Sequence, residues 1–137
     1  MRSHEPLPPA QIVNMAVKPY VLLDWVVRCG ACEDALIQLL RYAFLSEALC
    51  VSGHLPYAAE IVTSAQRRLA QFYAHASETG QWQLDDETYV ALQGALSAYV
   101  AQLHIVSTEG LQRAGILFEE WKQNHGKGTA LAQEASA

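Results

Sequence analysis

The chain has 137 residues, of which 51% are hydrophobic and 17% charged, and its net charge at pH 7 is −5. This length predicts one domain that buries a core without disulfide bonds, and the acidic balance argues against a basic face that grips nucleic acid. No 18-residue apolar run without charges occurs, which argues against a membrane span. Soluble domains average about 25% charged residues, so this chain has unusually few charged side chains for its surface. We therefore expect a protein partner or a second copy to cover part of that surface.

The two ends of the chain are predicted to lie outside the folded domain. Residues 1–9 contain three prolines and are expected to form a disordered lead, and residues 126–137 a disordered tail. Residues 10–125 then form a single helical domain. Three cysteines is an odd number, typical of reduced thiols, and residues 1–18 lack the order of a signal peptide. We therefore expect a cytoplasmic protein.

The domain is predicted to begin with a short helix. Residues 10–17 suit a helix with Pro9 in its first turn, and Pro19 is expected to interrupt that helix. Residues 20–29 fit either a strand or a helix by their apolar pattern. We favour a helix because no second strand is evident for pairing.

Three amphipathic segments follow, each bounded by a stop signal. The segment 32–51 has apolar residues on more than one face and is predicted to be the most buried helix. The segment 56–79 ends at Gly80, a residue typical of helix C-termini. Asp85 is the expected N-cap of the next helix. That helix carries an apolar stripe at spacings of three and four, which predicts packing against another helix: Tyr89, Leu92, Leu96, Tyr99, Leu103 and Val106.

The length of this last helix decides the expected assembly. A rod over residues 85–125 would be about 60 Å long, in a domain about 37 Å across, so only an obligate dimer would cover it. Gly110 and Gly115 each cost about 1 kcal/mol in a helix interior, and Ser107 or Thr108 can cap a new helix. We expect a break at residues 107–110. The predicted fold is an all-α, up-and-down bundle of four main helices with a short extra N-terminal helix.

The motif Cys29-Gly30-Ala31-Cys32 resembles the redox pair of the thioredoxin family. The resemblance implies a thiol-redox protein in which Cys29, at a helix N-terminus, is the attacking thiolate. It covers about ten residues of the 137, and the later strand pair and strand-opening proline of that family are missing. Thiol-redox activity of Cys29 and Cys32 is kept as the second alternative.

Cys29, Cys32, Cys50 and His54 have a spacing that is plausible for zinc. An intact helix over residues 33–49 is about 25 Å long and holds the two pairs apart, whereas zinc ligands lie within about 2.3 Å of one metal. We expect no metal. A phosphate-binding glycine loop, a Glu-x-x-His pair and a Gly-x-Ser-x-Gly elbow are also missing, so we expect no cofactor and no catalytic residues.

Residues 32–79 have the outline of a helix-turn-helix, with Arg67 and Arg68 on the second helix. Residues 56–60, where base-reading side chains normally lie, offer no cation to a phosphate. A DNA-binding regulator is therefore the first alternative, and nucleic acid is not the expected partner.

The favoured hypothesis is a non-enzymatic interaction or regulatory protein, homodimeric, that presents an apolar helix face to a protein partner. The first candidate surface is the wide apolar face near the C-terminal end. The second is an apolar face on the segment 32–51, and the third is a tryptophan in a loop. The candidate interface residues are Ile116, Leu117, Phe118 and Trp121, then Tyr42 and Leu45, and Trp82.

Overall fold

The computed structural model describes residues 5–125, and these form α-helices joined by short links. The described residues contain no sheet, only an isolated bridge between Pro6 and Ser107, so the predicted all-α class is confirmed. The elements are α1 (Pro9–Cys29), α2 (Glu33–Val51), a 3-10 turn η1 (Pro56–Ala58), α3 (Ala59–Thr79), α4 (Asp86–Leu103) and α5 (Thr108–His125).

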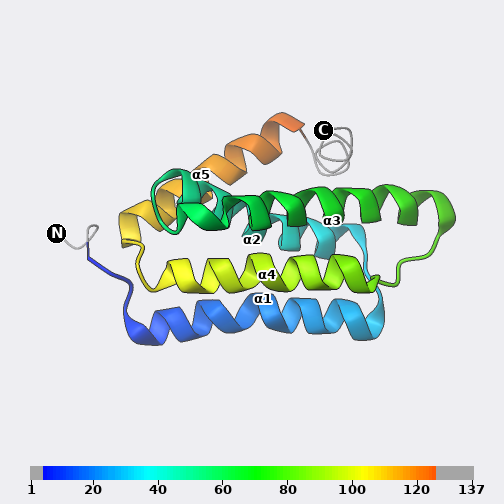
Figure 1. Cartoon of the computed structure of the whole chain (residues 1–137), viewed down its shortest axis with the longest axis horizontal. Coiled ribbons are helices and arrows are strands. Elements are labelled where there is room, and N and C mark those ends of the chain that lie inside the picture. Colours follow the sequence, from blue (N-terminus) through cyan, green and yellow to red (C-terminus); the bar gives the residue numbers. More distant parts are fainter. Residues whose placement is uncertain (1–4, 126–137) are drawn as a thin grey trace.

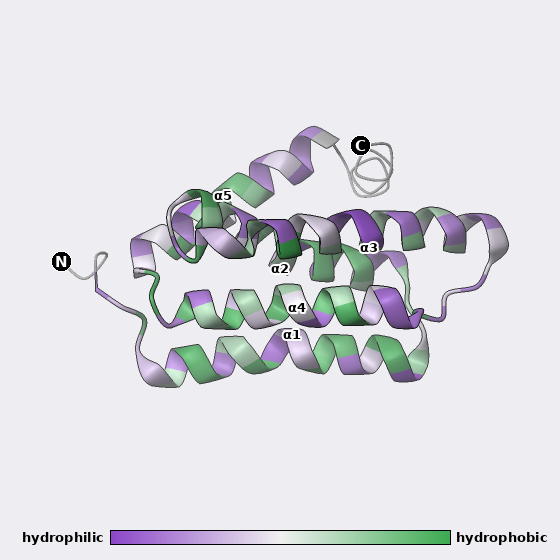
Figure 2. Cartoon of the chain, in the orientation of Figure 1, coloured by the Kyte–Doolittle hydropathy of each residue, from purple (hydrophilic) through white to green (hydrophobic). Residues whose placement is uncertain are grey.

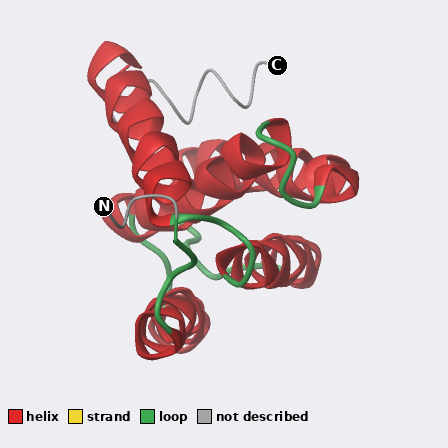
Figure 3. Ribbon diagram, turned by 90° about the vertical axis from the view of Figure 1, so that its left-hand side faces the viewer, coloured by secondary structure: helices red, strands yellow, loops and turns green. Residues whose placement is uncertain are grey.

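Helices α1 to α4 run in alternating directions along one long axis, and α5 crosses them at an angle (Figure 1 and Figure 3). Helix α2 packs on α1, α3, α4 and α5, whereas α1 packs mainly on α2 and α4. The α2 helix also buries the most side chains of α1 to α4. The prediction that segment 32–51 is the most buried is confirmed among these four helices.

Helix α1 corrects the prediction of a short helix that stops at Pro19. It is a single element of 21 residues, and Pro19 lies inside it, buried. The reason is an apolar row that continues across the proline, with Met15 before it and Leu23 and Val26 after it, packed on the other helices. Only a continuous helix keeps both halves of this row on one face, and that burial offsets the proline's missing hydrogen bond.

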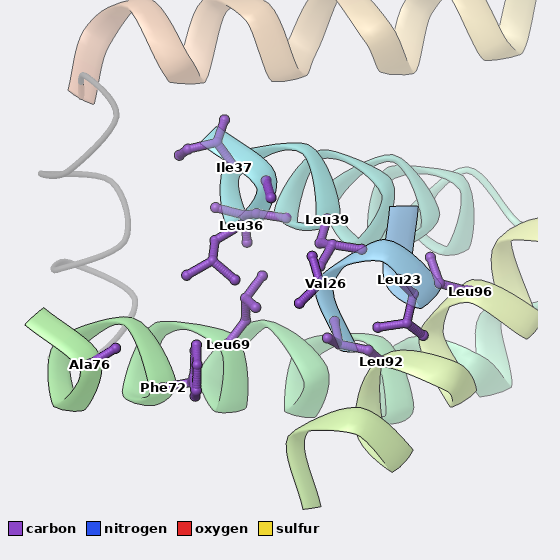
Figure 4. Close-up of a cluster of buried hydrophobic side chains, with 12 residues drawn as sticks. Leu23, Val26, Leu36, Ile37, Leu39, Leu69, Phe72, Ala76, Leu92 and Leu96 are labelled. Atoms are coloured by element: carbon purple, nitrogen blue, oxygen red, sulfur yellow. The ribbon is translucent and has the colours of Figure 1, made fainter. Parts of the chain in front are cut away.

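The largest core cluster lies where α1, α2, α3 and α4 meet. Figure 4 shows its side chains pointing toward one another from all four helices. Its members are apolar and at most 8% exposed, and each of the side chains larger than alanine contributes roughly 1.5–3 kcal/mol of burial free energy. The labelled residues are Leu23, Val26, Leu36, Ile37, Leu39, Leu69, Phe72, Ala76, Leu92 and Leu96.

The predicted break in the last segment is confirmed, and it lies at residues 104–107. Helix α4 ends at Leu103 and α5 begins at Thr108. Ser107 caps the new helix, because its hydroxyl oxygen accepts the Gly110 N–H at 3.0 Å. A Cβ on Gly110 would lie 3.1 Å from Cγ2 of Val106, which is fully buried. Gly110 therefore lies in the first turn of α5, after the break, where the absence of a side chain leaves room for Val106.

Residues 5–8 pack against the link between α4 and α5 instead of forming part of a disordered lead. Leu7 is 3% exposed, and the Thr108 N–H donates to the Glu5 carbonyl at 3.1 Å. Leu7 joins a second core cluster with residues of α2, α4 and α5. Burial of the Leu7 side chain therefore holds residues 5–8 against the helices. The rest of the expected lead (1–4) and the expected tail (126–137) lie outside the described residues.

A buried polar cluster joins α2, α4 and the turn between α2 and α3. The Gln102 side chain is fully buried; its amide nitrogen donates to the carbonyls of Ser46 at 3.1 Å and His54 at 2.8 Å, and lies 3.3 Å from Sγ of Cys50. The Ser46 hydroxyl donates to its amide oxygen at 2.6 Å. One amide thus satisfies polar groups on three parts of the chain.

Substituting Gln102 with Leu should lower the free energy of unfolding by about 2–4 kcal/mol, because the Ser46 hydroxyl and the His54 carbonyl lose their buried partner. Urea unfolding followed by far-ultraviolet circular dichroism measures the change. Gln93→Leu is the matched control, since Gln93 is exposed on the same helix and should change stability by less than about 0.5 kcal/mol. Equal effects of the two variants would contradict this role of Gln102.

Substitution by alanine should have different effects on the stability of the protein at the two glycines of α5. A Cβ on Gly115 meets nothing within 4 Å, so Gly115→Ala should stabilise the protein by about 0.5–1 kcal/mol through helix propensity. Gly110→Ala should give no such gain, because the methyl group presses on Val106 and on Oγ of Ser107. Thermal unfolding of both variants tests this, and a Gly110→Ala protein as stable as Gly115→Ala would contradict the close contact.

Candidate functional site

The predicted interface on α5 is divided between core and surface. Phe118 is 1% exposed, with its ring centroid 5.4 Å from that of Phe44 and 5.8 Å from that of Trp121. The Trp121 ring also packs on Phe44, at 5.6 Å, and is half-buried. These aromatic contacts attach α5 to α2. Ile116 and Leu117 are exposed, at 58% and 49%, and are the part of this set that reaches solvent.

The second and third choices of interface residue lie mainly in the core. The expectation that Leu45 has an exposed part is wrong, because it is 2% exposed within the second cluster. Trp82 is half-buried over the end of the first cluster, with its ring against those of Phe72 and Tyr73. Its carbonyl accepts the Ala31 N–H at 2.8 Å. Trp82 therefore closes the end of the core and joins the α3–α4 link to the α1–α2 link.

Among the described residues, α1 has more exposed large hydrophobic side chains than any other element, although the sequence did not predict an interface there. Hydrophobic residues occur along the whole length of this helix (Figure 2). Its inner row packs on α2 and α4, and a second row lies outside this packing, with Tyr20 reaching back to α4. We call this second row the outer row of α1; its members are 38% to 64% exposed, and they are Val13, Val17, Tyr20, Val21 and Trp25.

The spacing of the outer row is the signal that was missed. Val13, Val17, Val21 and Trp25 recur every four residues, a pattern that marks one side of a helix. Dividing the segment at Pro19 separates the row into two unconnected pairs. The pattern is visible in the sequence only when the helix is read through the proline.

The polar groups beside the outer row are largely paired. The Tyr20 and Ser97 hydroxyl oxygens lie 3.2 Å apart, which joins α1 to the exposed side of α4. At the C-terminal end of the row, Arg28 and Asp24 form an ion pair at 3.1 Å, four residues apart. The charged groups at the C-terminal end of the row are therefore already paired with each other.

The three cysteines do not gather at one place in the structure. Cys29 is the last residue of α1, so it lies at a helix C-terminus and not at the N-terminus that the resemblance implies, and Cys32 is the N-cap of α2. Both are exposed and unbridged. Cys50 lies at the far end of α2, about 27 Å along the axis; burial raises the pKa of its thiol, and the Gln102 hydrogen bond acts in the opposite direction. Within residues 5–125, no three metal-ligating side chains come together.

The helix-turn-helix outline gives an antiparallel pair of bundle helices. Helix α3 packs along α2 and α4 (Figure 1), and η1 adds a turn with the exposed Tyr57. Arg68 is engaged with Glu87 of α4 in an ion pair. The first turn of α3 offers Glu60 and no cation.

Comparisons of this chain with protein-family models, with curated proteins and with solved structures find no match. Within the described part of the chain, no helix combines the length and the apolar character that crossing a membrane requires. Function is therefore argued from the surfaces of the molecule.

Two tyrosines form a pair with tilted rings between α2 and α4. The ring centroids of Tyr42 and Tyr99 lie 5.4 Å apart, and Tyr99 is 2% exposed. Burial raises the pKa of Tyr42, and it raises that of Tyr99 to about 12; in both cases the positive charge of Arg41 acts in the opposite direction. Both phenols are therefore neutral hydrogen-bond donors at physiological pH.

The raised pKa of Tyr99 predicts a loss of stability in alkali. The unfolded phenol ionises near pH 10, whereas the folded one resists ionisation until about pH 12, so the free energy of unfolding is unaffected below pH 10 and falls between pH 10 and 12. Tyr99→Phe should reduce that fall by roughly 2–3 kcal/mol, and Tyr57→Phe, at an exposed site, should not. Urea unfolding at stepped pH measures it; an unchanged fall in Tyr99→Phe would contradict the assignment.

Proposed function

We propose that this protein is a non-enzymatic interaction protein that forms a two-fold homodimer through the outer row of α1. The observation that supports this is the row itself, a line of large apolar side chains over residues 13–25 of α1 that the other described residues leave 38% to 64% exposed. Monomeric proteins rarely expose a contiguous apolar surface of this kind without a partner. Of the predicted α5 surface, only Ile116 and Leu117 offer comparable exposure.

A second copy of α1 fits the outer row because the row is symmetric about position 19. In an antiparallel pair, Val17 lies opposite the partner's Val21, and Val13 lies opposite the partner's Trp25. Rows spaced four residues apart interdigitate when two helices cross at about −50°. The resulting contact is isologous, with the same residues on both sides, as closed dimers require.

The charges and the dimensions also favour a second copy. Asp24 and Arg28 are already paired with each other, so these two charges stay paired when the row is buried. Helix α1 with the adjacent side of α4 gives a face about 30 Å long and 20 Å wide. That is comparable with the roughly 800 Å² per partner of a stable interface.

The remaining parts of the hypothesis are consistent with this assembly. We propose that α1 to α4 form an up-and-down bundle to which α5 is added as a crossing helix. A cytoplasmic location is supported by three cysteines that are all unbridged, two of them exposed.

The dimer is tested by sedimentation of the full chain and of Val17→Glu/Val21→Glu at high micromolar concentration. The unsubstituted protein should be a dimer and the double variant a monomer, since the charges would face each other across the two-fold axis. The dimer should also show bluer Trp25 fluorescence than the monomer. Val51→Glu is the control, because Val51 is 84% exposed at the end of α2; it should remain dimeric.

Two outcomes contradict the proposal. If the unsubstituted protein sediments as a monomer, the proposed homodimer does not exist. A Val17→Glu/Val21→Glu protein that stays dimeric, while Ile116→Glu/Leu117→Glu dissociates, moves the interface to α5.

A further inference from the structure

The basic side chains of the described residues divide into two groups. Arg28, Arg68, Arg113 and Lys122 each form an ion pair. Lys18, Arg41 and Arg67 take part in no ion pair with another described residue. Two of these three, Lys18 and Arg41, line the same pocket. Two free cations at one pocket, in a chain with a net charge of −5, are an uncompensated local positive charge.

The pocket lies at the seam where α1 meets α2 and α4. Its volume is about 260 Å³, and its walls are Met15 and Lys18 of α1, Arg41 and Tyr42 of α2, and Tyr99 of α4. Helix α1 brings a flexible ammonium group to the exposed side, and α2 brings a half-buried guanidinium. No carboxylate is among these lining side chains.

The two phenols add hydrogen-bond donors to the same pocket. No hydrogen bond joins the hydroxyl of Tyr42 or Tyr99 to another described residue. The one buried side-chain nitrogen or oxygen without a partner in the described part of the chain is Nδ1 of His54. Both hydroxyls therefore reach solvent. The charge of Arg41 acts on both phenols, which places the guanidinium near the two donors.

We propose that this pocket binds a small oxyanion, the carboxylate or phosphate head group of an organic metabolite. Arg41 is the main anchor, because a planar guanidinium donates two parallel hydrogen bonds to such a group. Lys18 adds a mobile point charge, and Tyr42 and Tyr99 donate neutral hydrogen bonds. The Met15 side chain and the tyrosine rings form an apolar wall for a short organic tail, the usual composition of small-molecule sites. This site is independent of the dimer surface.

Two acidic residues of α5 lie near Arg41, outside the pocket. Arg41 also borders a surface hollow on α5 that includes Glu119 and Glu120. Glu119 is paired with Lys122 at 3.3 Å, so it is not committed to Arg41. Neutralising these carboxylates removes repulsion of an incoming anion and leaves the pocket itself unchanged.

Isothermal titration of the full chain with inorganic phosphate, phenyl phosphate, succinate and acetate tests the proposal. Binding of at least one probe is expected, and Arg41→Gln and Lys18→Gln should each weaken it by about tenfold or more. Arg67→Gln is the matched control, since it removes the third free cation, outside the pocket, and should leave the affinity unchanged. Tyr99→Phe should weaken binding less than Arg41→Gln, and Glu119→Gln/Glu120→Gln should strengthen it. Comparing the affinities of the phosphate probes with those of the carboxylate probes identifies the head group.

The proposal is overturned if none of the four probes binds at concentrations up to about 10 mM, or if Arg67→Gln weakens binding as much as Arg41→Gln, which would indicate attraction by surface charge alone. Circular dichroism and urea unfolding of each variant show whether the fold is kept. Binding that persists in Val17→Glu/Val21→Glu separates this site from the dimer surface.

Discussion

The buried Gln102 amide holds the arrangement on which every surface of this protein depends. Helices α2 and α4 are otherwise joined by apolar contacts, which favour burial but do not select one sliding position over another. Gln102 hydrogen-bonds to two carbonyls and one hydroxyl, so moving α4 along α2 by a single turn would leave these groups unpaired. The contact fixes the turn between α2 and α3 at the same time, because one acceptor is the His54 carbonyl. With α2, α3 and α4 fixed, α1 and α5 are added at the outside.

The helix boundaries that follow from local chemistry were predictable. Asp85 accepts the Thr88 N–H as an N-cap, Gly80 has the left-handed conformation of a C-cap, and the break after α4 has a serine cap. Each depends on one residue and its immediate neighbours. The course of α1 was not predictable in this way, because a proline inside a helix is tolerated only when packing on both sides of it offsets the lost hydrogen bond, and that packing comes from α2 and α4.

The candidate sites depend still more on tertiary structure. Phe118 and Ile116 are both apolar and lie two positions apart, yet one is 1% and the other 58% exposed. The difference comes from the crossing of α5 over α2, which brings Phe44 against one side of α5 only. The pocket lined by Lys18 depends on tertiary structure even more, because its five lining residues span positions 15 to 99. Their sequence spacing carries no motif, and the pocket exists only because α1 packs on both α2 and α4.

Helix α1 is the element that connects these observations. A helix with one apolar stripe has a single packing side, whereas α1 has an inner row that packs on the bundle and an outer row that lies outside this packing. Lys18 lies between the two rows, at the margin where the helix meets α2. The outermost helix of a bundle has no structural need for a second apolar side, and its valines would be more soluble as polar residues. The outer row is therefore the surface that the proposed dimer would cover, and Lys18 and Arg41 at its margin are the cations to which the proposed anion would bind.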